Sequence, residues 1–258
     1  MRLELLAPEG LPMFGPGDDL AALTVAALER DGVALADHDI VVVTAKAVSK
    51  VQGRMVALAT IEPSPRARKL GELTGKDPRL VELVLSQSRQ VIRARLGNLL
   101  VRHARGWVSG MAGIDRSNIG DEEYALVLPE DPDASAEELR SAFGALAGVD
   151  VAVVVSDSHG RPFRIGNTGI ALGAAGLCSV RYLEGQPDLF GRPLTGASVV
   201  PLADLVASAA ILLGGEANEG RPVVVVRGLD LSGDPRPAIE LIRPEATDLF
   251  AIADRDYQ

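Results

Sequence analysis

A short segment after an apolar run carries the densest set of side chains that could do chemistry. Residues 151–155 are Val-Ala-Val-Val-Val, and Asp157, Ser158 and His159 follow within four positions. Mg²⁺ prefers hard oxygen ligands, usually one or two carboxylates together with substrate phosphates. The segment therefore predicts a cation and phosphate site, in which His159 is a loop residue or a substrate contact. An ordinary turn at the end of a strand is the alternative interpretation.

A second polar segment, residues 113–120, places Asp115 and Asn118 between two glycines. A tight loop of this kind can present a carboxylate and an amide outward, although a polar turn that bonds its own backbone has the same composition. Residues 71–77 resemble a phosphate-binding loop only faintly, because the spacing is one residue short and Asp77 stands where Ser or Thr is needed. We therefore expect residues 71–77 to be a break between helices.

Two further segments could supply charged groups to the same site. Residues 214–220 place glycines beside Glu216 and Glu219, either of which could be a third acid. A helix end followed by a turn is the alternative there. Lys50 and Arg54 come just after an apolar strand and could hold phosphates, Lys50 as a point charge and Arg54 as a planar fork. A solvated strand end fits these two residues equally well.

Composition narrows the class of protein. Lys plus Arg number 26 and Asp plus Glu 35, so the formal net charge is −9, and aromatic residues make up 3%. Both values argue against a nucleic-acid partner. A lone Cys178 excludes a disulfide framework, and His38 and His103 lack metal-ligand spacing. Residues 1–11 show no signal-peptide pattern, and the apolar stretch 199–213 is too short to span a bilayer. We expect a cytoplasmic protein without membrane partners.

The elements that must position these residues follow from hydrophobic patterning. Asp18 or Asp19 should cap a helix, and Ser135 with Glu138 should form a capping box on another. Strands are expected at 39–44, 124–128, 149–155 and 222–227, and a hairpin at 99–109. Helices are expected at 65–74, 78–96, 132–146 and 199–213, and a polar loop or strand exit at 46–53. Interleaved strands and helices without a regular βαβ rhythm indicate an α+β fold of mixed sheets with flanking helices.

Six segments, weak singly but in a specific order, resemble the coenzyme F420-0:L-glutamate ligase (F420 γ-glutamyl ligase) family over about residues 3–250. The first segment is Leu-Pro-Met-Phe at 11–14 with Pro-Gly-Asp-Asp-Leu at 16–20, and the second is Val-Val-Val-Thr at 41–44 leading to Val-Ser-Lys at 48–50 and Gly-Arg at 53–54. The third is Gly-Ile-Asp-Arg-Ser-Asn at 113–118, and the fourth is Leu-Pro-Glu-Asp-Pro-Asp-Ala-Ser at 128–135. The fifth is Ser-Asp-Ser-His-Gly-Arg at 156–161, and the sixth is Gly-Glu-Ala at 215–217 with residues 222–228. The resemblance implies that GTP phosphorylates the terminal carboxylate of F420-0. L-Glutamate then attacks the acyl phosphate and forms an amide, and later glutamates are added through γ-linkages.

The resemblance also implies roles for individual residues. The catalytic residues are Asp115, Asp157 and Lys50, and the metal ligands are Asp115, Asp157, Ser158 and Glu216. The nucleotide-binding residues are Leu11, Pro12, Met13, Phe14, Ala45, Lys50, Asn118, Gly215 and Ala217. Two divalent ions, Mg²⁺ or Mn²⁺, are expected, and a K⁺ site is left open. Our own addition is that Arg54, Arg161 and Arg164 hold the anionic deazaflavin tail or glutamate.

This sequence departs from the family pattern at a few positions. Ala45 replaces a Ser that often contacts GTP, a loss of roughly 0.5–1.5 kcal/mol. Ser158 replaces Thr, and Met13 replaces an acid found in many relatives. We expect one ligase domain over residues 1–250, a tail at 251–258 and no nitroreductase-like domain. The resemblance implies an intertwined homodimer with the active site near the interface.

Three competing functions follow from the same residues. A metal-dependent phosphohydrolase that uses Asp115 and Asp157 would release phosphate from GTP without an acceptor. A ligase of the same fold could join glutamate to another carboxylate acceptor. A catalytically silent domain that binds the deazaflavin would not need a full metal set.

Overall fold

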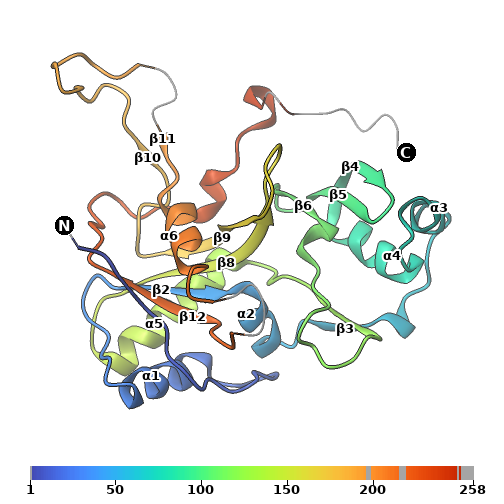
Figure 1. The fold of residues 1–258 in the computed structure, drawn as a ribbon, viewed down its shortest axis with the longest axis horizontal. Helices are drawn as coiled ribbons and strands as arrows, with labels where there is room; N and C mark the ends of the chain where they lie inside the picture. The colour runs from blue at the N-terminus through green and yellow to red at the C-terminus, as the bar shows by residue number, and fades with distance from the viewer. Residues whose placement is uncertain (1, 196–198, 215–218, 249, 251–258) are drawn as a thin grey trace.

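The computed structural model describes residues 2–195, 199–214, 219–248 and 250. A five-stranded sheet forms its centre, in the order β1-β12-β2-β8-β9 (Figure 1). Its strands are β1 (Glu4–Leu6), β2 (Ile40–Thr44), β8 (Ala152–Gly160), β9 (Asn167–Ala175) and β12 (Val223–Arg227). β2 and β8 run parallel and the other neighbours are antiparallel. The mixed sheet confirms the expected α+β class.

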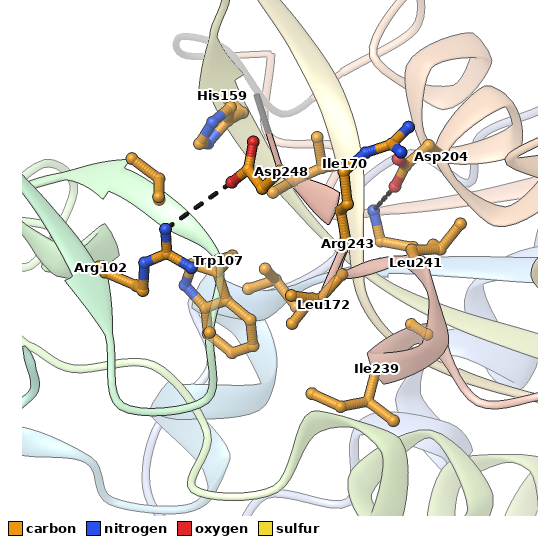
Figure 2. Close-up of a pocket in the computed structure, with 15 residues that line it drawn as sticks. Arg102, Trp107, His159, Ile170, Leu172, Asp204, Ile239, Leu241, Arg243 and Asp248 are labelled. Carbon is orange, nitrogen blue, oxygen red and sulfur yellow. Dashed lines mark hydrogen bonds and ion pairs between the residues drawn. The ribbon is translucent and has the colours of Figure 1, made fainter. Parts of the chain in front are cut away.

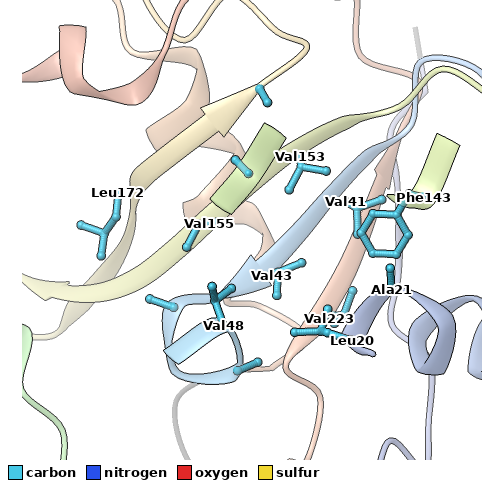
Figure 3. Packing of buried hydrophobic residues seen from close by; sticks show 14 of the residues in the cluster. Leu20, Ala21, Val41, Val43, Val48, Phe143, Val153, Val155, Leu172 and Val223 are labelled. Atoms are coloured by element: carbon cyan, nitrogen blue, oxygen red, sulfur yellow. The ribbon is translucent and has the colours of Figure 1, made fainter. Parts of the chain in front are cut away.

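Helices cover both faces of the central sheet (Figure 1). α1 (Leu20–Arg30) and α5 (Pro132–Ala147) pack on one face and α6 (Leu202–Ala210) on the other. Alternate residues of β2 and β8 therefore enter two different cores, which explains why both strands read as continuous valine-rich runs. Figure 3 shows the first core, in which Val153 and Phe143 are completely buried.

A smaller layer is inserted between α2 (Ala45–Val51) and α5. It contains α3 (Pro65–Thr74), α4 (Pro78–Ser86) and a three-stranded sheet of β4 (Ser88–Arg95), β5 (Asn98–His103) and β6 (Val108–Gly110). β3 (Met55–Ala57) pairs with β7 (Tyr124–Leu126), and β10 (Arg181–Tyr182) with β11 (Val199–Val200). Single 3₁₀ turns lie at 58–60, 111–113, 238–241 and 245–247. None of the described helices is long and apolar enough to cross a membrane.

Several local predictions are confirmed by the caps of the helices. Asp19 caps α1 by accepting a hydrogen bond from the Ala22 N–H at 2.9 Å. Gly75 ends α3 in the left-handed region, with φ 69°, and Asp77 caps α4. Residues 71–77 are therefore a helix break, as expected. His103 stacks on Trp107 with ring centroids 4.4 Å apart, which agrees with a structural role.

Two predictions of local structure were wrong. Residues 46–53 are mostly helical, because Thr44 at the end of β2 caps α2 through the Ala47 N–H. The helix expected at 78–96 stops after Ser86, and residues 88–95 form β4, which pairs with β5. Pairing with a distant strand is a tertiary effect that local periodicity does not contain.

Other boundaries also differ. Asp131 caps α5 in place of Ser135, whose hydroxyl instead donates to the Asp131 carbonyl. The strand expected at 149–155 runs from Ala152 to Gly160, so residues 156–159 lie within a strand and do not follow it. The helix expected at 199–213 is limited to α6, and β9 was not predicted at all.

Candidate active site

A cavity of about 500 Å³, the main cavity, lies at the end of the central sheet. Thr44, the last residue of β2, and residues 156–158 of β8 reach it from two adjacent parallel strands. The carboxyl ends of parallel strands are where open sheets commonly bind ligands. The main cavity is lined by Leu11, Pro12, Met13, Phe14, Val42, Thr44, Lys46, Ala47, Lys50, Gly110, Gly113, Ile114, Asp115, Ser117, Asn118, Ser156, Asp157, Ser158, Ala210, Ile211, Gly214, Glu219, Gly220, Arg221, Pro222 and Val224.

The loop 113–118 is fixed beside the cavity by its own backbone. Gly113 adopts φ 71°, and a Cβ there would lie 2.5 Å from the Leu128 side chain, so glycine is needed for both reasons. Asp115 and Leu126 exchange two backbone hydrogen bonds of 3.0 and 2.9 Å. The Asp115 Oδ1 also accepts the Ser117 N–H at 2.7 Å. The loop is therefore both a polar turn that bonds its own backbone and a part of the cavity wall, so the two interpretations of this segment do not exclude each other.

Two lysines on α2 contact this loop from the opposite wall. The Lys46 Nζ lies 2.6 Å from the Asp115 Oδ2 and donates to the Ser117 Oγ at 2.7 Å. The Lys50 Nζ donates to the Asn118 carbonyl at 2.7 Å. Residues four apart on a helix share a face, so α2 directs both ammonium groups at one loop.

The electrostatics of these groups are coupled. Burial acts to raise the pKa of Asp115, but hydrogen bonds from Lys46 and the Ser117 backbone prevail, and the pKa is lowered overall. Burial, assisted by the nearby charge of Lys46, lowers the pKa of Lys50. The wall thus combines an ionised carboxylate with two closely spaced cationic groups, an arrangement suited to a polyanionic ligand and its counter-ion.

The polar residues of β8 that reach the cavity follow an irregularity in the strand. The pairing of β8 with β9 shifts register between Val155 and Ser156, immediately before the residues that reach the cavity. Such bulges are common beside active sites because they redirect side chains. Ser156 is buried, whereas Asp157 is half-buried and Ser158 exposed.

Most of the predicted site residues come together in the main cavity. Its walls contain Leu11, Pro12, Met13, Phe14, Lys50, Asp115, Asn118, Asp157 and Ser158. Ala45 is fully buried and does not line the cavity. Gly215, Glu216 and Ala217 lie outside the described residues.

The three arginines predicted to hold substrate do not line the cavity. Arg54 is half-buried and donates to the Leu128 carbonyl at 3.2 Å. Arg161 and Arg164 lie at the exposed tip of the β8–β9 hairpin, where Arg161 donates to the Ile165 carbonyl. Their role in substrate binding stays a prediction.

Sequence reasoning missed Lys46, whose Nζ lies 2.6 Å from the Asp115 Oδ2 in the main cavity. The signal was the spacing of Lys46 and Lys50, which places both on one helical face. It was overlooked because residues 46–53 were expected to be a loop. Thr44 and Arg221 also line the cavity without having been singled out.

A smaller cavity of about 230 Å³ lies where the β4–β6 sheet, β9 and the C-terminal segment meet (Figure 2). Arg102 is almost fully buried there, 3.2 Å from Glu245 and 3.7 Å from Asp248. The Asp204 Oδ1 accepts the Ala171 N–H at 2.8 Å, and burial raises the pKa of Asp204. Among the described residues, its lining includes none of the predicted catalytic, nucleotide or metal residues. We assign the chemistry to the main cavity.

The fold and the main cavity together describe an α+β protein with lysines and carboxylates gathered at the end of a mixed sheet. The family model described as F420-0:γ-glutamyl ligase matches residues 10–228. The chain belongs to this ligase family.

Three relatives illustrate how far the similarity extends. A protein of Methanothermobacter thermautotrophicus is 42% identical over 255 residues, covering 97% of this chain and 99% of its own. One of Methanopyrus kandleri is 43% identical and covers 91% and 92%. One of Methanocaldococcus jannaschii is 35% identical and covers 96% and 97%. All three are named coenzyme F420:L-glutamate ligase.

Proposed function

We propose that this protein uses GTP to join L-glutamate to the terminal carboxylate of F420-0, and then adds further glutamates through γ-linkages. The names of the relatives support the ligation of glutamate to this coenzyme. The observation that carries the proposal is that residues predicted from four separate segments of the sequence line one cavity.

The proposed reaction has two steps. The γ-phosphoryl group moves from GTP to a carboxylate oxygen of F420-0, which gives an acyl phosphate and GDP. The glutamate amine then attacks the acyl carbon, the bond from that carbon to the phosphate oxygen breaks, and the amine loses a proton. The products are the amide, GDP and inorganic phosphate.

The walls of the main cavity match the needs of this reaction. Residues 11–14 provide a largely apolar wall against which a guanine ring can pack, and Lys46 and Lys50 supply positive charge that can pair with phosphate oxygens. Phosphoryl transfer is catalysed mainly by positioning and by electrostatic stabilisation of the transferred group. The chain therefore acts by orienting the nucleotide, the acceptor and the amine and by excluding water.

The same wall fits divalent cations. Asp115, Asp157 and Ser158 offer two carboxylates and a hydroxyl, which are hard oxygen donors suited to Mg²⁺ or Mn²⁺. Within the described ranges, no three His, Cys, Asp or Glu side chains form a ready metal cluster, so we propose that Glu216 and phosphate oxygens complete the coordination. Two such ions, with K⁺ as a further candidate, would neutralise charge on the nucleotide and the acceptor.

The test is a mass-spectrometric ligation assay with F420-0, L-glutamate, GTP and either Mg²⁺ or Mn²⁺. We expect products heavier by successive glutamyl units, with GTP and not with ATP. Asp157→Asn should abolish them, and Glu29→Gln, which removes an exposed acid on α1, should not. An absence of glutamylated product from the unaltered protein would contradict the proposal.

The controls of that assay separate the competing functions. Steady phosphate release from GTP without any acceptor would identify a phosphohydrolase. Glutamylation of a different carboxylic acid, but not of F420-0, would identify a ligase with another acceptor. Binding of F420-0 without turnover would identify a silent binding domain.

We also propose that the protein assembles as a homodimer. Phe163 and Ile165 at the tip of the β8–β9 hairpin, and Leu189 and Phe190 between β10 and β11, are almost fully exposed apolar side chains. Exposed apolar residues grouped on projecting hairpins are typical of association surfaces. Light scattering should give twice the chain mass of 27.0 kDa, and the double substitution Phe163→Ser with Ile165→Ser should shift it toward one chain.

A further inference from the structure

Both oxygens of the Asp115 carboxylate already have donors within the chain. The Oδ2 lies 2.6 Å from the Lys46 Nζ, and the Oδ1 accepts the Ser117 N–H at 2.7 Å. The Ser117 bond holds the turn of the loop, whereas the Lys46 contact joins two side chains that are each about 30% exposed. A cation that binds Asp115 must therefore compete with Lys46, which can leave without unfolding the loop.

Lys50 has a different kind of partner on the same loop. Its Nζ donates to the main-chain carbonyl of Asn118, which carries no net charge. The Lys46 charge already opposes protonation of Lys50, so the two ammonium groups repel each other. If a cation took over the charge of Asp115, this repulsion would be compensated best by an anion that enters between the lysines.

We propose that Lys46 is an exchangeable counter-charge that couples cation binding to phosphate binding. Lys46 neutralises Asp115 while the cavity holds no cation, is displaced when a divalent cation binds that carboxylate, and then binds a phosphate oxygen of the nucleotide. The inference rests on the proposed function, because it requires a nucleotide and a divalent cation in the main cavity. Lys46 is a positioning residue for Asp115 before it becomes a phosphate ligand.

If Lys46 competes with the cation, removing it should strengthen Mn²⁺ binding. Removing a residue with a merely structural role would not strengthen it. Lys46→Met removes a competitor for Asp115, so Mn²⁺ should bind the nucleotide-free protein more tightly, by about two- to fivefold, the factor that an ion pair of this exposure is worth. The same substitution should weaken binding of a nucleotide. Because coupling is reciprocal, the factor by which nucleotide strengthens Mn²⁺ binding should shrink in the variant.

Lys50→Met is the matched control. This substitution removes the same charge from the same helix face and cavity. The partner of Lys50, however, is the uncharged Asn118 carbonyl and not the Asp115 carboxylate for which Mn²⁺ competes. Any tightening of Mn²⁺ in this variant measures the general loss of positive charge. The additional tightening in Lys46→Met measures direct competition for Asp115. Lys46→Arg keeps the charge and should keep the coupling.

The experiment is calorimetric titration of Mn²⁺ into the full chain, with and without a non-hydrolysable GTP analogue, for the unaltered protein and the three variants. Circular dichroism should show the same fold in each. The expected result is that Mn²⁺ binds more tightly to Lys46→Met than to Lys50→Met, and that the coupling falls further in Lys46→Met than in Lys50→Met. Equal effects in Lys46→Met and Lys50→Met would overturn this inference while leaving the proposed function intact. An unaltered protein that binds neither Mn²⁺ nor the analogue would overturn both.

Discussion

Asp115→Asn separates the chemistry of the main cavity from the stability of the fold. Asparagine keeps an oxygen that can accept the Ser117 N–H, so the turn of the loop is retained. It loses the negative charge that pairs with Lys46. We propose that the same negative charge also binds the divalent cation. We therefore expect a large loss of activity with a small loss of stability.

The magnitudes follow from the contacts of Asp115. The lost pair with Lys46 is about 30% exposed on both sides, so its removal should lower the free energy of unfolding by about 0.2–1 kcal/mol. For a chain of this size, that shifts the melting temperature by only about 0.4–4 °C. Loss of an electrostatic contact to the transferred phosphoryl group should lower kcat/KM by at least about 100-fold, or roughly 2.7 kcal/mol.

The pH dependence gives an internal check on the stability effect. The folded-state pKa of Asp115 lies below the ordinary value of 3.8. Its contribution to stability is therefore present above pH 3.8 and is lost as the pH falls through the lower, folded-state pKa. Urea denaturation should show the small gap between the two proteins at pH 7 and its closure at the acid end.

The two measurements are kcat/KM for ligation and thermal denaturation on the same preparations. A melting temperature lower by more than about 8 °C would mean that Asp115 mainly supports the fold. Activity within about threefold of the unaltered protein would refute its assignment to the reacting groups.

Three further predictions concern the sheet that carries the site, each measured as the free energy of unfolding in urea. Asp39→Asn should cost about 1.5–3 kcal/mol, because Asp39 is buried and accepts two hydrogen bonds from Arg227; an unchanged midpoint would contradict this. Phe143→Ala should cost about 3–5 kcal/mol, since Phe143 is completely buried against the first face of the sheet, and a cost below about 1 kcal/mol would refute the packing. Gly173→Ala should cost at least about 1–3 kcal/mol, because its Cβ would lie 2.0 Å from the Pro132 carbonyl oxygen; a neutral effect would show that α5 can move away from β9.

Local signals were sufficient to predict where α1, α3 and α4 begin. Asp19, Ser64 and Asp77 each accept a backbone N–H at the start of a helix, and α3 has the predicted bounds. β2 and β12 were predicted because their valine runs are buried on both faces. In each of these elements, local preference and tertiary environment agree.

The missed elements depend on contacts between distant segments. β9 contains Gly169 and Gly173, which disfavour a strand locally, yet a Cβ at either would lie within 2.3 Å of backbone in α6 or α5. These glycines are required by the helices that pack on β9, and the sequence of β9 alone does not show that packing. α2 was missed because Lys46 and Lys50 made its segment look like an exposed loop.

The candidate site was predictable largely because the family resemblance selected residues that local reasoning left open. Asp115 and Asp157 lie 42 positions apart in the chain, and nothing in either segment alone indicates that they share a cavity. The contact between Lys46 and Asp115 could not be predicted, because it depends on α2 and the loop 113–118 lying opposite each other.

In the proposed reaction, the main cavity activates the terminal carboxylate of F420-0 by transferring a phosphoryl group to it. The most direct test is oxygen transfer from F420-0 whose terminal carboxylate carries two ¹⁸O atoms, followed by mass spectrometry of both products. We expect one ¹⁸O in the released phosphate and one in the new amide. Phosphate without ¹⁸O, formed together with glutamylated product, would contradict an acyl-phosphate route.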